Sequence, residues 1–488
     1  MDVLNKTIKR LSEEEYQELL QEVSGKKKNK PFVVLETARN SEVSDNEMME
    51  ILQVNPSTYY TLKSRMNNKI ASILSKNVNN PISALMEEVA RVPANLFGTN
   101  KTFSIRALKE LEKQLLEYDL SSELIVVYKT LAQLHTFSPD YKYYLNLYNR
   151  HVAYSLAVSK AEVQLITFFS KLGTYLLTRQ QSDLEEVILL KRELQNISEL
   201  YESHRLFVIY NIASTYYLCA LPQKRSSLKA KELEIEEIIN TIDSTFEKYN
   251  LDTFYQNLKP VTDCLFFEYY QRSGNQVRAD HYLQKIILQL EELSSKHANN
   301  FFLSQFMHSR IEKYMHDGDA ERLFLLSKLF ADNCLIDKDE LYHYVSQRWF
   351  KATASFYSRD YAQAAKVIND LRNDVSFKAC LFTELELKLF QSLQYCAIGE
   401  DGLCNQLISS IKRQMRGSDF NLEAINIFIK LLKTAMKPSD YRKKIQKINN
   451  LYLEFTAANE NSDTPILASI RLDETILRKM ANPLKEDS

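Results

Sequence analysis

Glycine and proline are scarce in this chain of 488 residues. The sequence holds only 8 glycines and 10 prolines, whereas glycine alone accounts for about 7% of the residues in a typical protein. Tight turns and β-hairpins depend on these two residue types, so few of them are expected. The composition therefore favours helices joined by short polar connections over a fold rich in hairpin turns.

Long apolar runs are also absent. No stretch of 18 apolar residues occurs, and the N-terminal sequence MDVLNKTIKRLSEEEYQ has no apolar signal segment. Neither membrane insertion nor secretion is expected, so we expect a cytoplasmic protein with no membrane partner. The formal net charge of -1 argues against a polyelectrolyte partner held by the whole surface. A nucleic acid would therefore meet only a local patch.

Signatures of catalysis and of metal binding are missing from the sequence. The six cysteines are spaced 8 or more residues apart with no C-x-x-C pair, so we expect reduced thiols in the core. The two closest histidines, His308 and His316, are 8 positions apart. No phosphate-binding glycine pattern and no G-x-S-x-G motif occurs. We expect no enzymatic activity, no catalytic or metal-binding residues and no cofactor.

Helical periodicity is the main positive signal. From about residue 103 to residue 435, apolar residues recur at helical spacing. One such stripe consists of Leu108, Leu111, Leu115, Leu116 and Leu120. Polar segments at 273–275 and 317–319 interrupt the pattern where two helices would fold back on one another. Between residues 140 and 437 the only prolines are Pro222 and Pro260, and we expect both to interrupt helices. The pattern predicts a run of antiparallel helix hairpins.

One expected hairpin carries a pattern of aromatic and small residues. The segment WFKATASFYSRDYAQAAKVINDLR holds large side chains at Trp349, Phe356 and Tyr361 and small ones at Ala352 and Ala365. It resembles a tetratricopeptide repeat (TPR), a helix pair of about 34 residues, although it lacks the glycine that usually follows position 352. The resemblance implies that these five residues pack the two helices of a repeat together, with a turn at residues 359–360.

Two further segments resemble the same repeat. CLFFEYYQRSGNQVRADHYLQKI places Tyr269, Tyr270, Ala279 and Tyr282 similarly, and VIYNIASTYYLCA matches only the first helix. A segment of about 300 residues with even composition favours an array in which each hairpin packs on the next and a concave groove binds a partner. Simple core packing in a helical bundle is the alternative explanation of these aromatic and alanine positions.

Residues 1–78 show a different pattern. LSEEEYQELLQEV and PFVVLETARN predict two short helices separated by the basic linker GKKKNK, with Pro31 in the first turn of the second helix. The following segment is SDNEMMEILQVNPSTYYTLKSRMNNKIASIL. It predicts a helix over Asp45–Leu52, a turn over Gln53–Asn55 and a second helix from Pro56 to about Leu74, with Asn55 as its cap.

This helix pair resembles the helix-turn-helix of bacterial regulators and of the promoter-reading region of sigma factors, in which KSR recurs on the second helix. Two positions depart from that pattern, because Met49 replaces a small residue and Gln53 replaces a glycine. The apolar residues that would lock the two helices together are Met48, Leu52, Val54, Tyr59 and Leu62. The resemblance implies a DNA-binding surface at the start of the second helix.

The local charge supports this interpretation. Residues 51–78 contain four basic residues and no acidic ones, although the whole 1–78 segment holds 12 basic and 11 acidic residues. Base edges would meet Ser57, Thr58, Tyr60, Thr61 and Ser64, and phosphates would meet Lys63, Arg65, Lys69 and Lys76. A cationic helix pair that caps the repeat array, or that docks on an acidic protein, is the alternative.

The sequence thus predicts an all-α protein in four parts. A helix-turn-helix-like domain occupies residues 1–78, connecting helices residues 79–125, a TPR-like α-solenoid of antiparallel hairpins residues 126–437, and a C-terminal helix and tail residues 438–488. The last segment predicts either a helix that caps the final hairpin or a mobile tail.

We expect a non-enzymatic regulator of bacterial type. Its N-terminal domain would bind DNA or the transcription machinery, including RNA polymerase, and its groove would bind a protein or peptide. A scaffold that binds only proteins is the alternative. Helix-turn-helix proteins often act as dimers, yet no sustained heptad pattern occurs, so an oligomer is possible but not specified.

Overall fold

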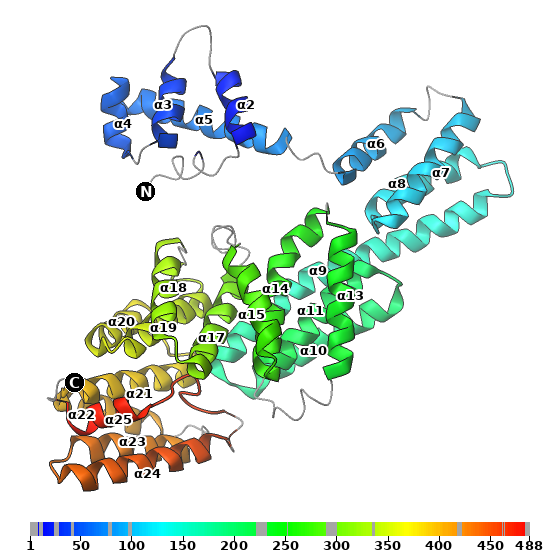
Figure 1. Cartoon of the computed structure of the whole chain (residues 1–488). Coiled ribbons are helices and arrows are strands. Elements are labelled where there is room, and N and C mark those ends of the chain that lie inside the picture. The colour runs from blue at the N-terminus through cyan, green and yellow to red at the C-terminus, as the bar shows by residue number, and fades with distance from the viewer. Residues whose placement is uncertain are drawn as a thin grey trace. The chain divides into compact units, whose positions relative to one another are not determined.

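The chain folds into helices joined by short connections, which confirms the expected all-α class. The computed structural model describes Ile8 and residues 13–23, 29–40, 43–76, 81–95, 100–220, 232–250, 252–288, 300–333, 337–416, 422–460, 462 and 464–483. These residues form 22 helices and no strand. They belong to two compact units, residues 1–145 and 146–488, each of which is considered by itself (Figure 1).

The first unit contains two groups of helices. The first group is α2 (Glu13–Val23), α3 (Lys30–Asn40), α4 (Asp45–Leu52) and α5 (Pro56–Lys76). The second is α6 (Pro81–Asn95), α7 (Lys101–Glu117) and α8 (Ser121–Leu134), which all contact one another. The leucine stripe expected from the sequence lies on α7, where Leu108, Leu111 and Leu115 are buried and Leu116 is exposed.

The second unit is built from successive helices of 8 to 38 residues. α9 (Tyr141–Thr178) begins within the first unit and continues in the second. The helices that follow are α10 (Gln181–Leu200), α11 (His204–Ala220), α13 (Glu232–Lys248), α14 (Thr253–Ser273), α15 (Gln276–Leu288), α17 (Asn300–Asp317), α18 (Ala320–Asn333), α19 (Leu341–Tyr357), α20 (Tyr361–Asp374), α21 (Leu381–Ile398), α22 (Asp401–Gln414), α23 (Leu422–Met436), α24 (Tyr441–Glu460) and α25 (Glu474–Ala481).

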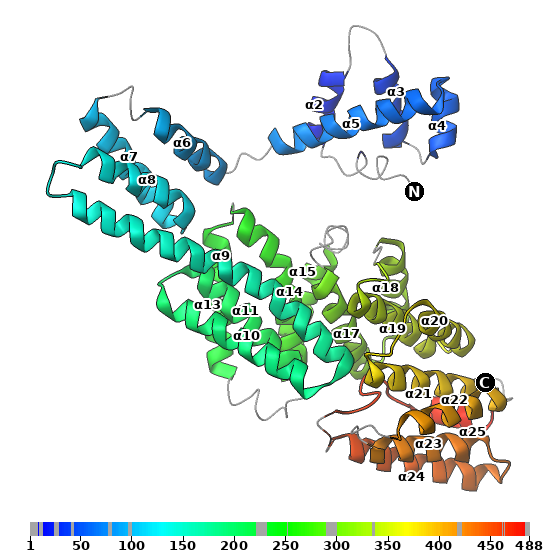
Figure 2. The ribbon, with the colours of Figure 1, turned by 180° about the vertical axis from the view of Figure 1, so that it is seen from behind.

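Helices of the second unit pack mainly against their neighbours in the sequence. The closest partners are the hairpins α14 with α15, α19 with α20, α21 with α22 and α23 with α24. Alternate helices also touch, because α11 contacts α14, α14 contacts α17, α17 contacts α19 and α21 contacts α23 (Figure 2). Each hairpin therefore buries part of its surface on the next one.

Short turns join these helices where the sequence predicted them. α14 ends at Ser273 and α15 begins at Gln276, while α17 ends at Asp317 and α18 begins at Ala320. The glycine in each turn adopts the left-handed region, with φ of 87° at Gly274 and 75° at Gly318. A side chain would be strained in this region, which explains why two of the few glycines lie here.

The expected interruption at Pro260 is wrong. α14 runs without a break from Thr253 to Ser273 with Pro260 in its interior. Proline removes a backbone hydrogen bond and costs about 3 kcal/mol inside a helix. Residues after it, including Val261 and Leu265, are buried, and this tertiary packing holds the helix together.

Pro222 and Cys334 lie outside the described residues, whereas the other five cysteines are buried free thiols.

The residues assigned to repeat packing lie in α19 and α20. Trp349, Ala352, Phe356, Tyr361 and Ala365 are all buried, with exposed fractions of 6% or less. The ring of Phe356 lies 5.4 Å from that of Tyr361, across the turn between the two helices.

These helices also pack on the next hairpin through one aromatic side chain. Phe390 of α21 places its ring 5.0 Å from Trp349 and 5.4 Å from Phe356. The same residues therefore join the two helices of a pair and connect that pair to its successor.

The described C-terminal residues are packed against the preceding helices. α25 contacts α21, α23 and α24, and it buries Ile476, Leu477 and Met480. The backbone N–H of Arg471 donates to the Tyr357 hydroxyl at 2.8 Å, and that of Leu467 donates to the Glu386 carboxylate at 2.8 Å. Of the two alternatives left open by the sequence, a helix that packs on the last hairpin agrees with α25 (Glu474–Ala481), which contacts α23 and α24.

An ion cluster that includes the buried Glu268 lies between α14 and α17. Glu268 is 2% exposed, and its carboxylate lies 3.3 Å from the guanidinium of Arg272, which is also 3.3 Å from the carboxylate of Glu312. Burial raises the pKa of Glu268 to about 7, against the opposing effect of Arg272. The folded chain therefore holds this carboxyl partly protonated near neutral pH.

Stability should depend on pH through Glu268. Between about pH 4.5 and about pH 7 the folded chain keeps this proton while the unfolded chain releases it, so the free energy of unfolding falls as pH rises. Glu268→Gln removes this dependence. Relative to the native chain, the variant should gain up to about 3 kcal/mol between about pH 5 and about pH 8.

Thermal unfolding of both proteins at these two pH values measures the gain. Glu237→Gln, at an exposed position of α13, is the matched control and should show no such pH-dependent change. A difference between Glu268→Gln and the native chain that is the same at both pH values would contradict the assignment.

Candidate nucleic-acid interface

The four helices α2 to α5 share a small apolar core. Met48 and Leu52 of α4 and Tyr59 of α5 are buried in it, and Val54 and Leu62 pack against it. These are the five residues that the sequence assigned to locking α4 onto α5. Side chains from α2 and α3, such as Leu19 and Leu35, fill the rest of this core. Helices α2 and α3 therefore stabilise the α4–α5 pair.

Both helices begin with the caps that their sequences favour. Ser44 and Glu47 form a capping box, in which the Ser44 N–H donates to the Glu47 carboxylate at 2.8 Å and the Glu47 N–H donates to the Ser44 hydroxyl at 3.4 Å. At the start of α5, the Asn55 side chain accepts a hydrogen bond from the Thr58 N–H at 2.8 Å. The expected helix bounds and the Asn55 cap are therefore confirmed, with α5 ending at Lys76 rather than near Leu74.

The turn between α4 and α5 depends on a left-handed residue. Gln53 has φ of 49° and ψ of 55°, and its N–H donates to the Glu50 carbonyl at 3.1 Å. Non-glycine residues in this region cost roughly 1 kcal/mol. The left-handed turn therefore lies at the position where the resemblance to helix-turn-helix proteins predicts a glycine and this sequence has Gln53.

One carboxylate ties the two helices together, and sequence reasoning missed it. Asp45, in the first turn of α4, accepts a hydrogen bond from the Tyr59 hydroxyl at 2.8 Å and from the Lys63 ammonium at 2.9 Å. The Lys63 side chain is only 17% exposed. The spacing of Tyr59 and Lys63, one helical turn apart, was the available signal, but nothing in the sequence identified their partner.

The remaining residues of the predicted interface lie on the opposite side of α5. Ser57, Thr61, Arg65 and Lys69 follow one another at helical spacing and are exposed. Tyr60 is 53% exposed. Of the nine residues named for DNA contact, the Lys76 side chain lies outside the described part of the structure. Seven of the other eight are exposed, namely Ser57, Thr58, Tyr60, Thr61, Ser64, Arg65 and Lys69. Lys63 is the exception.

The exposed face of α5 carries positive charge, and the helix has no acidic residue. The N-terminal end of the helix dipole favours an anion such as phosphate, although Pro56 has no N–H and the Thr58 N–H already donates to Asn55. Arg65 and Lys69 add two positive charges further along. The Glu47 carboxylate belongs to α4 and not to this face. It accepts hydrogen bonds from Ser44 at the start of α4, and these lower its pKa.

The described residues provide neither a metal-binding cluster nor a helix able to span a membrane. Within those residues, no cluster of three or more histidine, cysteine or acidic side chains is placed to hold a metal ion. No described helix combines the length and apolar character that a membrane span requires. The exposed face of α5 is the candidate functional surface.

The turn offers a direct test of backbone geometry. Gln53→Gly should stabilise the first unit by about 1 kcal/mol, because glycine adopts the left-handed region without steric cost. Gln21→Gly, at an exposed helical position of α2, should instead destabilise it by about 1 kcal/mol. Chemical denaturation of the three proteins measures both changes. A Gln53→Gly variant no more stable than the native chain would contradict the strained turn.

Comparison with protein-family models, with curated proteins and with solved structures found no match to this chain. The likeness to helix-turn-helix and tetratricopeptide proteins consequently rests on the residues and contacts described above.

Proposed function

We propose that this chain is a regulatory protein whose α4–α5 pair binds duplex DNA as a helix-turn-helix. The observation that carries the proposal is the exposed face of α5. Ser57, Thr61 and Ser64 are exposed on the same helix as the exposed Arg65 and Lys69, and no carboxylate occurs on that helix. Such a face can meet base edges with its polar groups and phosphates with its cations.

The second part of the proposal concerns residues 146–488. We infer that their hairpins form a TPR-like solenoid that binds a protein or peptide partner. Two observations support this inference, namely the contacts between alternate helices and the aromatic junction of Trp349, Phe356 and Phe390. In a solenoid each repeat contacts only its neighbours and the curved inner face is available to a ligand.

A specific observation favours the alternative of a scaffold without nucleic-acid binding. Lys63, one of the cations assigned to phosphate, is held by Asp45 inside the helix pair. A phosphate would have to compete with that carboxylate. Under the scaffold hypothesis, the same exposed face of α5 docks on an acidic protein instead of on DNA.

Binding of the full chain to labelled mixed-sequence duplex DNA across a salt series tests the proposal. Four phosphate contacts give a slope of log K against log salt near -3.6, about a hundredfold loss between about 50 and about 200 mM salt. If Lys63 stays with Asp45, three contacts remain, and the slope is near -2.7 with a loss of about fortyfold. We expect the smaller value.

Alanine variants identify the cations involved. Arg65→Ala with Lys69→Ala should weaken binding and reduce the slope by about 1.8, whereas Lys63→Ala should leave the slope nearly unchanged. The matched control combines Lys30→Ala and Arg91→Ala, which remove exposed charges from α3 and α6. Absence of DNA binding at about 50 mM salt would overturn the DNA-binding proposal and leave the scaffold.

A further inference from the structure

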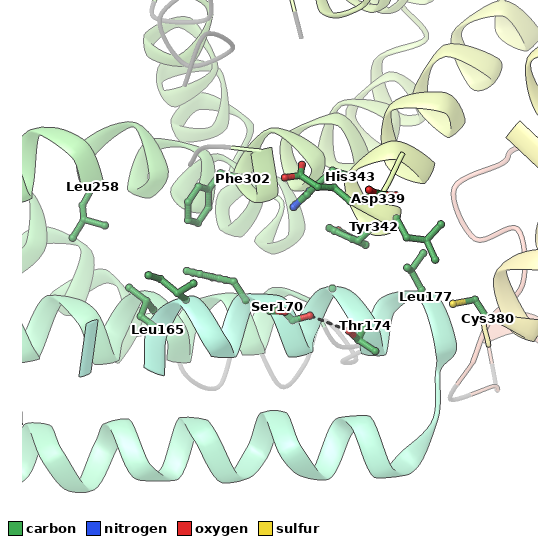
Figure 3. A pocket seen from close by; sticks show the side chains of 15 residues that line it. Leu165, Ser170, Thr174, Leu177, Leu258, Phe302, Asp339, Tyr342, His343 and Cys380 are labelled. Atoms are coloured by element: carbon green, nitrogen blue, oxygen red, sulfur yellow. Dashed lines mark hydrogen bonds between the residues drawn. The ribbon is translucent and has the colours of Figure 1, made fainter. Parts of the chain in front are cut away.

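The second unit contains a cavity of about 630 Å³ against the last turns of α9. Figure 3 shows Thr174 of α9 on one side of this space and Phe302 and Tyr342 on the other. Its lining is mostly apolar, and Glu340 and His343 at its border already interact with other residues. The lining therefore does not favour one class of ligand. Another surface of the same unit is more informative, because a segment of the chain covers it.

Residues 464–473 lie between α24 and α25 in the sequence and form no helix. Figures 1 and 2 show this segment in red beside α21. The Ser469 hydroxyl accepts a hydrogen bond from the indole N–H of Trp349 in α19 at 3.1 Å. The Arg471 guanidinium donates to the Met315 carbonyl in α17 at 3.0 Å. The segment thus contacts helices that precede it by more than 100 residues.

Side chains of the helices also hold the main chain of this segment. Three of its backbone N–H groups donate to side-chain oxygens of α19, α21 and α24. The three pairs are Arg471 to Tyr357 at 2.8 Å, Leu467 to Glu386 at 2.8 Å and Leu472 to Tyr452 at 3.0 Å. Such bonds do not depend on the side chains that the segment carries. In peptide recognition, main-chain hydrogen bonds supply affinity and pockets for side chains supply specificity.

Aliphatic side chains fill the surface beneath the segment. Four of them have exposed fractions of 6% or less, namely Ile466, Leu467, Ile470 and Leu472. Ala468 and Arg471, which lie between them, are exposed. The segment therefore combines main-chain hydrogen bonds with buried aliphatic residues, which is how a bound peptide is held.

The backbone of Leu467 indicates that the site imposes the conformation of the segment. Its φ is 52°, in the left-handed region that large side chains rarely adopt. The buried side chain and the hydrogen bond to Glu386 keep it there. Because this strain opposes binding of the segment, a peptide that binds without it has an advantage in competition.

We propose that the surface formed by α17, α19, α21 and α24 binds a non-helical, aliphatic peptide of a partner protein, and that residues 464–473 occupy this site as an internal ligand. The inference rests on the proposed partner binding by residues 146–488. The partner peptide carries aliphatic residues at the spacing of Ile466, Leu467, Ile470 and Leu472. A segment on the same chain competes at an effective concentration of about 1 mM, so the native chain binds a free peptide weakly.

The single tryptophan of the chain makes this site measurable. Trp349 is that residue, and it contacts Ser469 directly. A dansyl-labelled peptide with the sequence of residues 464–473 receives energy from Trp349 only when it lies near this side chain. Anisotropy of the dansyl group reports binding anywhere on the chain. Both signals are recorded on the full chain during titration with the peptide.

Variants that weaken the internal segment should bind the peptide more tightly than the native chain. Ile470→Asp with Leu472→Asp should strengthen binding about tenfold, because the site is then vacant for a larger fraction of the time. Ile470→Ala, a smaller change, should strengthen it about threefold. The matched control combines Leu403→Asp and Leu453→Asp at exposed positions of α22 and α24, and it should bind like the native chain. Thermal unfolding verifies that each variant is folded.

Substitutions in the site test the main-chain contacts. In the Ile470→Asp, Leu472→Asp chain, adding Tyr357→Phe and Tyr452→Phe should weaken peptide binding about tenfold, because two N–H groups lose their acceptors. Tyr441→Phe, at an exposed position of α24, is the matched control and should leave binding unchanged.

Energy transfer that strengthens in the weakened variants and falls in the phenylalanine variant supports the proposal. Equal affinity in the native and weakened chains, or no energy transfer up to about 1 mM peptide in a folded weakened variant, overturns it. Increased anisotropy without energy transfer overturns this site but supports partner binding elsewhere on residues 146–488. Native dimers in light scattering that disappear in the Ile470→Asp, Leu472→Asp chain identify the segment of a second copy as the occupant, and they also overturn the proposal.

Discussion

Burial of aromatic side chains between successive helix pairs is the interaction on which residues 146–488 depend. Phe390 lies within 5.4 Å of both Trp349 and Phe356, so one ring from a following helix completes the core of the preceding pair. Most of these helices have 13 to 21 residues, and helices in proteins take most of their stability from the packing of an apolar face rather than from helix propensity. Each hairpin consequently requires the surface of its neighbour.

Packing between neighbouring helices also explains why this unit tolerates residues that would destabilise an isolated helix. α14 accommodates Pro260 in its interior, and it also carries Glu268, an ionisable side chain that is only 2% exposed. A single helix would lose stability from either feature. Packing on both sides fixes the backbone and offsets these costs, so the helix continues.

The α4–α5 pair depends on a different kind of interaction. Its two helices share an apolar core with α2 and α3, but Asp45 connects their polar edges through Tyr59 and Lys63. That connection stiffens the pair and withdraws Lys63 from its surface. Specific contacts with a duplex would therefore fall to the exposed hydroxyl groups, to Arg65 and to Lys69, which gives the proposed interface a modest positive charge.

The sequence by itself determined the helical class, the bounds of α4, the start of α5 with its Asn55 cap, and the turns at 273–275 and 317–319. These are local features, because apolar spacing, caps and glycines act within a few residues. Only the tertiary structure decided that Pro260 leaves α14 intact, that Asp45 holds Lys63, and that Phe169, Phe302 and Tyr342 border one cavity. Phe169 and Phe302 are 133 positions apart and come into contact because whole helices pack together. Local sequence patterns cannot predict such a contact.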